Sequence, residues 1–499
     1  MKHRQTRREF LKPLATGAAA LAAPNLLLPA DRPARRPNIL FALADDWMWP
    51  KAAIGGDKVI QTPTFDRLAR SGVLFTNAFV SAPSCSPSRA AMVTGQYHWR
   101  LEEGANLSVT LPAKFEVYPD LLEAAGYHVG FTRKGWGPGN ETAGGRTRNP
   151  AGPRFRDFDA FLAARPKDKP FCFWFGSQDP HRPYEWESGV KSGMKLSDVQ
   201  VPPYLPDTET VRKDICDYYW KAQRFDRETG ELLATLDKTG ELQNTLVVIS
   251  GDNGWPFPRS KATVYEAGTH VPLAVCWPGR VAGGRVIEDF VSLSDVAPTF
   301  LEAAGLPPRP AMTARSLMSV LRSDKSGRVD PKRDHVLTGM ERHVPCRGEI
   351  RGGYPMRALR NHQFHYIRNF KPERWPAGDP EACAAPDSKG CGYDQLAKNT
   401  RVGFADVDAG PTKAYMGLHR NEASVQPLFE LAFGKRPERE LYDLKKDPWQ
   451  MHNVAADPAY AGVLRRLDAQ LTAELRQTAD PRIEGRGDIF DQYKGQLMS

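Results

Sequence analysis

The chain has 499 residues, of which 41% are hydrophobic and 25% are charged, a composition typical of a globular protein. This length exceeds that of most single domains, so we expect one large domain together with a smaller one. The formal net charge of +9 suits an anionic ligand. No run of lysine and arginine is interleaved with aromatic residues, which argues against a nucleic-acid partner.

The first thirty residues have the pattern of an export signal. Arg7 and Arg8 stand in a positively charged segment, and a mildly apolar, Ala-rich stretch follows over 13–30. Paired arginines here mark the twin-arginine route, so we expect residues 1–30 to be a signal peptide read by the twin-arginine export machinery. The mature protein would then be periplasmic or secreted. The alternative is an uncleaved membrane anchor, which a short stretch interrupted by proline disfavours. Since no later segment reaches transmembrane length, we expect no stable membrane span in the mature form.

Strand and helix patterns alternate over residues 37–335. Continuous apolar runs, typical of strands buried on both faces of a parallel sheet, lie at 38–44, 171–176 and 245–250. Weaker strand patterns lie at 73–80, 127–132 and 273–277. Helical patterns lie at 64–71, 118–125, 207–236 and 294–304. The alternation predicts an α/β domain over 37–335 with a large, mostly parallel sheet.

Polar side chains directly follow four of the predicted strands. They are Asp45, Asp46, Lys134, His181, Asp252 and Asn253. Because the carboxyl ends of parallel strands meet at one edge of a sheet, we expect these groups to lie together. Three carboxylates and one amide oxygen form a hard-oxygen set that suits Ca²⁺ or Mg²⁺. Taken singly, the two adjacent aspartates also fit a solvated turn, and the histidine also fits a structural role.

The sequence pattern changes near residue 335. Short strands, such as 362–368 and 440–444, mix with loops rich in Pro, Gly and Lys, and a helical pattern follows at 460–478. We therefore expect a smaller C-terminal α+β subdomain over 336–480. The remaining residues, 481–499, are expected to form a loosely ordered tail.

The most distinctive stretch is Ser84-Cys85-Ser86-Pro87-Ser88-Arg89, which leads into a short helical pattern closed by Gly95. A cysteine beside a helix N-terminus and an arginine is typical of a reactive thiolate with a lowered pKa. The alternative is a buried structural cysteine in a turn.

This stretch, with Thr94-Gly95 behind it, resembles the C-x-P-S-R and T-G signature of the type I, formylglycine-dependent sulfatases. Further motifs of that family occur in the family's order and spacing: Asp45-Asp46, Asp179-Pro180-His181, Asp252-Asn253-Gly254 and Glu440-Leu441-Tyr442-Asp443-Leu444. The resemblance covers nearly all of residues 37–480. It implies an alkaline-phosphatase-like sandwich, in which helices flank the large sheet of a catalytic domain and the smaller subdomain follows.

The resemblance also implies a role for each site residue. Cys85 would be converted to formylglycine by a formylglycine-generating or other sulfatase-maturing enzyme, and the hydrated aldehyde would be the nucleophile. Arg89 would stabilise that hydrate, Lys134 and Lys261 would bind sulfate oxygens, and His181 would protonate the leaving atom. The implied cation is Ca²⁺, although the ligand set also permits Mg²⁺. Its ligands would be Asp45, Asp46, Asp252, Asn253 and the modified Cys85.

The substrate implied by the resemblance is a sulfated carbohydrate. Within the family, the segments 179–182, 201–206, 252–258 and 354–357 are most similar to the sulfatases that remove N-sulfate from glucosamine in heparan-type glycans. N-sulfoglucosamine is therefore the first expectation, and an O-sulfate of another glycan is the alternative. Substrate contacts are expected from Trp136, Glu341, Arg342, His343 and Arg357.

One residue departs from the family pattern, and another departs only from the pattern of the N-sulfatases. The family usually has G-K-x-H after the strand at 127–132, and Trp136 occupies the position of that histidine. Tryptophan cannot accept the proton that the histidine would take, so either another group takes it or the step differs. The same departure supports a non-enzymatic alternative, a degenerate protein that only binds sulfated glycans.

Lys261 stands where the N-sulfatases have an arginine. This difference leaves open whether the substrate carries an N-sulfate or an O-sulfate group. A related phosphoryl-transfer hydrolase would have Thr or Ser at position 85.

Overall fold

The computed structural model describes residues 36–348, 351–380 and 391–495. The predicted signal peptide, residues 1–30, lies outside this part of the chain. The strands are β1 (Asn38–Ala44), β2 (Val73–Phe75), β3 (Ala78–Phe79), β4 (His128–Arg133), β5 (Phe171–Gly176), β6 (Thr245–Gly251), β7 (Leu273–Cys276), β8 (Arg285–Ile287), β9 (Val291–Ser292), β10 (His335–Met340), β11 (Met356–Asn361), β12 (Phe364–Asn369) and β13 (Arg439–Asp443). The helices are α1 (Pro63–Ser71), α2 (Cys85–Thr94), α3 (Tyr118–Ala124), α4 (Phe158–Ala164), α5 (Ser188–Lys191), α6 (Glu209–Lys238), α7 (Glu266–Thr269), α8 (Val296–Ala303), α9 (Met318–Leu321), α10 (Tyr393–Lys398), α11 (Pro411–Leu418), α12 (Gln426–Phe433), α13 (Ala461–Gln477) and α14 (Ile489–Gln492).

The large sheet has seven strands in the order β4-β5-β1-β6-β7-β2-β8. Strand β1 pairs in parallel with both β5 and β6, and β4 pairs in parallel with β5. Strand β7 runs antiparallel to both β6 and β2. The prediction of a large, mostly parallel sheet is confirmed.

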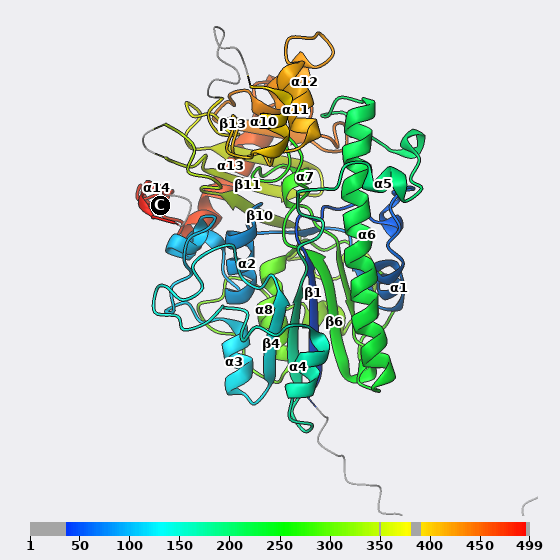
Figure 1. Ribbon diagram of the computed structural model, residues 1–499. Coiled ribbons are helices and arrows are strands. Elements are labelled where there is room, and N and C mark those ends of the chain that lie inside the picture. Colours follow the sequence, from blue (N-terminus) through cyan, green and yellow to red (C-terminus); the bar gives the residue numbers. More distant parts are fainter. Residues whose placement is uncertain (1–35, 349–350, 381–390, 496–499) are drawn as a thin grey trace, which may run out of the picture. The chain divides into compact units, whose positions relative to one another are not determined.

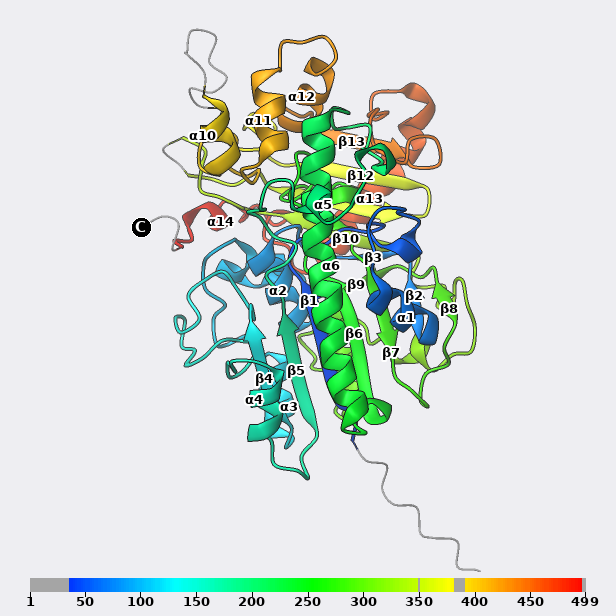
Figure 2. The same cartoon turned by 45° about the vertical axis from the view of Figure 1, so that its right-hand side comes forward.

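Both faces of this sheet are covered by helices, as Figures 1 and 2 show. All seven residues of β1 are buried, and successive side chains of the strand enter different cores. Leu40 and Ala42 pack with residues of α1, α4 and α6, whereas Ile39 and Phe41 pack with residues of α2, α3 and α8. A continuous apolar run satisfies both cores, which is why the sequence of β1 does not alternate with polar residues.

A second, antiparallel sheet has the order β10-β11-β12-β13. Helix α13 packs on it through Leu467, Leu471 and Leu475, which share a core with residues of all four strands. This sheet also meets the segment before Cys85, because the Gly339 N–H donates to the Ser81 carbonyl oxygen at 2.9 Å. The predicted small sheet and C-terminal helix are confirmed.

Residues 481–495 pack against the protein, which corrects the expectation of a loosely ordered tail. Phe490 in α14 is only 1% exposed, and Arg482 forms an ion pair with the buried Glu341. The apolar burial and the ion pair hold this segment in place. Among the described residues, no helix is both long enough and apolar enough to cross a membrane.

Candidate active site

The predicted site residues meet at the carboxyl ends of the parallel strands. Asp45 and Asp46 follow β1, Asp252 and Asn253 follow β6, and Cys85 is the first residue of α2. The ligand atoms of Asp45, Asp46, Cys85 and Asp252 all lie within 4.8 Å of one another, and all four residues are buried. These residues therefore lie together at one edge of the sheet, as the sequence predicts.

The loop after β4 brings a lysine to the same edge. Lys134 N–H donates to the Gly176 carbonyl oxygen at 2.9 Å, so the ends of β4 and β5 lie close together. A Cβ atom on Gly176 would lie 1.6 Å from the Lys134 carbonyl oxygen, so this approach requires glycine. The Lys134 ammonium then reaches Asp45, with Nζ 2.6 Å and 2.7 Å from its two carboxylate oxygens.

Each of the three buried aspartates has a cationic side chain at hydrogen-bond distance. Lys134 binds Asp45, the Arg89 Nε–H donates to Asp252 at 2.7 Å, and the Lys261 ammonium donates to Asp46 at 2.8 Å. Burial alone would raise the pKa of Asp45, but Lys134, His181 and Arg89 together hold it well below its usual range. Burial raises the pKa of Asp252 to about 6 in spite of Arg89, and the negative charge of Asp45 adds to this effect.

A hard divalent cation fits this group of oxygen atoms. The Asn253 amide donates from Nδ2 to Asp46 Oδ1 at 2.7 Å. Its Oδ1 atom is buried and has no hydrogen-bond partner among the described residues. An unpaired buried amide oxygen beside three carboxylates is a donor set that Ca²⁺ and Mg²⁺ both accept.

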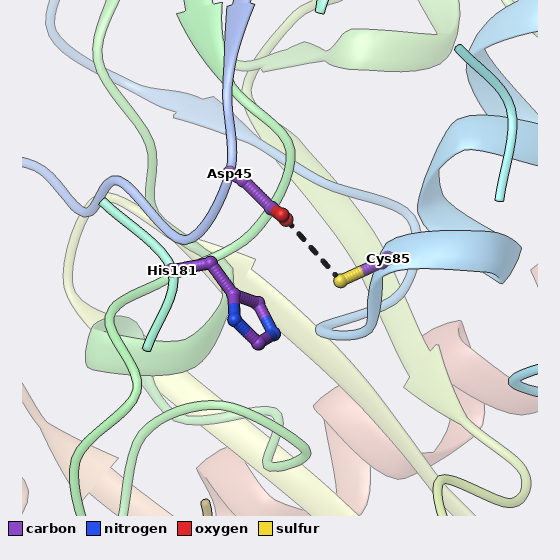
Figure 3. A group of neighbouring side chains, drawn as sticks. All are labelled: Asp45, Cys85 and His181. Atoms are coloured by element: carbon purple, nitrogen blue, oxygen red, sulfur yellow. Dashed lines mark hydrogen bonds between the residues drawn. The ribbon is translucent and has the colours of Figure 1, made fainter. Parts of the chain in front are cut away.

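Cys85 is buried as the first residue of α2. Its side chain is 2% exposed, and Sγ lies 3.4 Å from Asp45 Oδ1, as drawn in Figure 3. Burial raises the pKa of this thiol well above its usual value. The prediction of a thiolate with a lowered pKa is therefore wrong, because burial outweighs the lowering effect of the Lys134 and Lys261 ammonium groups. The Arg89 guanidinium instead binds Asp252 and the carbonyl oxygens of Lys134 and Gly135.

His181 presents one ring nitrogen to the same centre. Its Nδ1 lies 2.6 Å from the Arg182 carbonyl oxygen, which can only accept, so Nδ1 carries a hydrogen atom. The other nitrogen, Nε2, lies 3.8 Å from Asp46 Oδ2. Figure 3 shows the ring beside Asp45 and Cys85, and the ligand atoms of these three residues lie within 4.8 Å of one another.

A cavity of about 830 Å³ lies beside these groups. Asp45, Cys85, Lys134, His181 and Lys261 all line this cavity, which we call the catalytic cavity. Further basic side chains line it, namely Arg133, Arg154, Arg182, Lys221 and Arg401. A cavity with this excess of positive charge suits an anionic ligand.

Comparison with known proteins identifies the family. The family model described as Sulfatase matches residues 37–148 and 153–306, which is more than half of the chain. The chain belongs to the sulfatase family. Members of this family hydrolyse sulfate esters and sulfamates.

The curated relatives of this sulfatase include human and bacterial enzymes. Human N-sulphoglucosamine sulphohydrolase is 30% identical, over 90% of this chain and 91% of that protein. An ulvan-active sulfatase of Formosa agariphila is 27% identical, over 93% of this chain and 77% of that protein. Both alignments extend through the second sheet.

Solved structures share the fold of this sulfatase at low sequence identity. One structure, described as a complex with its substrate D-glucosamine-2-N,6-O-disulfate, has a TM-score of 0.64 and 17% identity and covers 89% of this chain and 98% of its own. The phosphonate monoester hydrolase of Silicibacter pomeroyi has a TM-score of 0.63 and 18% identity, over 89% of this chain and 96% of its own. The expected alkaline-phosphatase-like α/β fold is confirmed.

Two of the five residues expected to contact substrate line the catalytic cavity of this sulfatase. These are Trp136 and His343. The Trp136 indole is almost fully buried, and its Nε1 has no hydrogen-bond partner among the described residues. The His343 Nδ1 lies 2.8 Å from Ser84 Oγ, directly before Cys85. Burial lowers the pKa of His343, which favours the neutral ring at this position.

The other three, Glu341, Arg342 and Arg357, lie outside the lining of the catalytic cavity. Arg357 is fully buried and pairs with both Glu341 and Asp480. Arg342 donates to carbonyl oxygens of Asp491 and Tyr493 in the C-terminal segment. Their contacts fix that segment to the second sheet, and the expectation that they bind substrate stays a prediction.

Sequence reasoning missed Asp408, whose carboxylate lines the catalytic cavity 2.9 Å from Lys261 Nζ. The ligand atoms of Asp408, Asp46 and His181 lie within 4.8 Å of one another. Asp408 stands in a loop without a motif, so only the folded structure connects it to the site.

Proposed function

We propose that this sulfatase removes sulfate from a sulfated carbohydrate with a nucleophile made from Cys85. The observation that carries the proposal is the convergence of Cys85, His181 and three buried aspartates beside the basic catalytic cavity. Conversion of Cys85 to formylglycine by a maturing enzyme would replace an inert, protonated thiol with an aldehyde whose hydrate supplies the attacking oxygen.

A Ca²⁺ ion, or Mg²⁺, would be held by Asp45, Asp46, Asp252 and Asn253 together with the modified Cys85. When bound, the cation would lower the pKa of the nucleophile and polarise a sulfate oxygen. The unpaired Oδ1 of Asn253 and the convergence of three carboxylates support this ligand set.

The remaining residues have roles that follow from their placement. Arg89 is fixed by Asp252 and two carbonyl oxygens beside Cys85, where it would stabilise the hydrate. Lys134 and Lys261 place their ammonium groups at the aspartates, where they would bind sulfate oxygens. His181 would donate a proton from Nε2 to the leaving oxygen or nitrogen.

We infer N-sulfoglucosamine as the first candidate substrate, because the human relative with 30% identity is named for that substrate. An O-sulfated glycan is the second candidate. It is supported by Lys261, where a single ammonium replaces a guanidinium fork, and by the similarity to ulvan-active sulfatases.

We also propose that residues 1–30 direct export by the twin-arginine route, so that the mature sulfatase works in the periplasm or outside the cell. Arg7 and Arg8 before an Ala-rich stretch support this. Replacing both arginines by lysine should retain the protein in the cytoplasm, which fractionation would detect. Unchanged export would contradict the proposal.

The test of function is sulfate release from a panel of sugars. Purified protein, produced together with a sulfatase-maturing enzyme, is incubated with N-sulfoglucosamine, glucosamine 6-sulfate and galactose 4-sulfate, and free sulfate is measured by ion chromatography. The proposal predicts release from at least one sugar, and none with Cys85→Ala. If protein with converted Cys85 releases sulfate from none of them, the non-enzymatic alternative of glycan binding is favoured.

A further inference from the structure

A second cavity adjoins the catalytic cavity. It has a volume of about 650 Å³ and shares five lining residues with the catalytic cavity, namely His181, Arg182, Pro183, Thr400 and Asp408. The shared wall includes His181, and the ligand atoms of His181 and Cys85 lie within 4.8 Å of each other, so the aromatic cavity adjoins the residue beside the proposed nucleophile. We call this second space the aromatic cavity.

Besides His181, three aromatic residues line the aromatic cavity, and two of them remain unusually exposed. Trp186, in the loop before α5, is 41% exposed, and Tyr393, the first residue of α10, is 42% exposed. Large apolar side chains left open to solvent at a cavity commonly mark a ligand-binding surface. Lys213 Nζ lies 6.0 Å from the centroid of the Trp186 ring, which is a cation–π contact.

These aromatic residues stand on a supported frame. Helices α5 and α11 both pack against α6, and α10 packs against α11. Figure 2 shows α5, α10 and α11 near the same end of α6. Arg182, in the wall between the cavities, binds Asp214 of α6 through two hydrogen bonds of 2.8 Å, and Thr412 of α11 donates to the same carboxylate at 2.6 Å. These contacts fix the position of the aromatic cavity relative to the catalytic cavity.

The charged side chains of the aromatic cavity already have partners inside the protein. Arg182 pairs with Asp214, and Lys398 pairs with Asp394 at 3.0 Å. Asp217 accepts hydrogen bonds from the N–H groups of Glu187 and Gly189. The lining of the aromatic cavity holds two basic side chains, Arg182 and Lys398, against four carboxylates, so it lacks the excess positive charge of the catalytic cavity. It offers aromatic faces for stacking, and carboxylate oxygens with remaining lone pairs for hydroxyl groups.

We propose that the aromatic cavity is a subsite for a second sugar ring, joined by a glycosidic bond to the sulfated sugar in the catalytic cavity. The apolar C–H face of a pyranose ring would stack on Trp186 or Tyr393, while its hydroxyl groups bond to carboxylates. The inference rests on the proposed function and extends it, since it makes an oligosaccharide, and not a single sugar, the preferred substrate.

The test compares single sugars with disaccharides that contain them. N-sulfoglucosamine is paired with N-sulfoglucosaminyl-glucuronic acid, and galactose 4-sulfate with a carrageenan disaccharide that carries it. Wild-type protein should show at least about tenfold higher kcat/KM on the disaccharide of the pair that it hydrolyses. Trp186→Ala and Tyr393→Ala should each remove most of this advantage through KM, with the single sugar hydrolysed at the wild-type rate.

The matched control is Trp449→Ala. Trp449 is 40% exposed, like Trp186, but it lines a different cavity beside Pro50 and Tyr265. This variant should keep the full disaccharide advantage. The subsite would be contradicted if Trp186→Ala and Tyr393→Ala lowered kcat/KM equally for the single sugar and its disaccharide. It would also be contradicted if neither variant changed kcat/KM.

Failure of the proposed function gives a different result. If wild-type protein releases sulfate from no sugar, the subsite is judged by binding of the same two disaccharides. Either disaccharide should then change the tryptophan fluorescence of wild-type protein, and Trp186→Ala should lose most of that change. Absence of the change with both disaccharides, or its persistence in Trp186→Ala, would overturn the inference.

Discussion

The Asp408 carboxylate lies 2.9 Å from the Lys261 ammonium, which also lies 2.8 Å from Asp46. Lys261 therefore stands between two carboxylates at the wall of the catalytic cavity. Burial alone would lower the pKa of Lys261, but Asp408 and Asp46 raise it well above its usual value. The pair with Asp408 keeps Lys261 charged and fixes where the charge lies.

Asp408→Asn should therefore lower kcat by about 10²-fold, because the Lys261 ammonium loses one of the two anions that hold it. The midpoint of thermal unfolding should change little, since the amide still fits. Asp159→Asn, at an exposed aspartate on α4, is the control and should leave kcat unchanged. Full activity of Asp408→Asn would show that this carboxylate does not position Lys261.

Removal of a bound cation should destabilise the protein. Three buried carboxylates converge beside Asn253 Oδ1, which has no hydrogen-bond partner among the described residues, so a bound cation would offset their mutual repulsion only in the folded state. At a free concentration about 100-fold above Kd, Ca²⁺ would add about 2.7 kcal/mol to the free energy of unfolding.

Thermal unfolding with Ca²⁺, with Mg²⁺ and with a chelator measures this effect. Asn253→Leu should bind less cation, detected by elemental analysis, and should gain less stability from it. Unfolding midpoints that do not respond to chelator or cation, with no metal in the purified protein, would contradict the cation site.

A substitution of Arg357 distinguishes a residue that contacts substrate from one that only stabilises the fold. Its guanidinium is fully buried and lies 2.7 Å from Asp480 and 2.5 Å from Glu341. Arg357→Leu leaves both carboxylates without this partner and should cost about 3–5 kcal/mol in the free energy of unfolding, measured with denaturant. At low temperature the folded protein should keep its KM. A large rise in KM without loss of stability would support the expected substrate contact.

His335 should make stability depend on pH. Its two ring nitrogens lie 2.6 Å from Asp334 and 2.9 Å from Glu474. Burial alone would lower the pKa of His335, but these hydrogen bonds outweigh it and raise the pKa. The protonated ring therefore stabilises the fold fully below the unfolded pKa of about 6.5, and this contribution disappears as the pH rises through the higher folded pKa.

His335→Gln should accordingly lose about 1 kcal/mol of stability at acidic pH and almost none at alkaline pH. Denaturant unfolding at about one pH unit below and three units above 6.5 compares the two conditions. The exposed His452 provides the control substitution His452→Gln. Equal losses at both pH values would contradict a role for the protonated ring.

The strand ends were predictable because their physical signals are local. The runs at 38–44, 171–176 and 245–250 are apolar without alternation, as burial on both faces requires, and each becomes a strand of the large sheet. The polar residues after them could be assigned to one edge because parallel strands share a direction. Cys85, His181 and the aspartates therefore meet where the sequence predicts.

Contacts between distant segments were not predictable in the same way. Arg357 and Glu341 are charged residues without a pattern, so nothing in the sequence shows that Asp480 and Arg482 neutralise them. Asp408 reaches Lys261 only because its loop folds over the cavity. The raised pKa of the Cys85 thiol depends on burial, which a motif does not report.

Mass spectrometry of the tryptic peptide 71–89 tests the central claim most directly, because this peptide contains Cys85 and ends at Arg89. Protein produced with a maturing enzyme and active in sulfate release should carry an aldehyde in place of the thiol. The fraction of converted peptide should rise in proportion to activity across preparations. Fully active protein in which Cys85 is entirely unmodified would contradict the account.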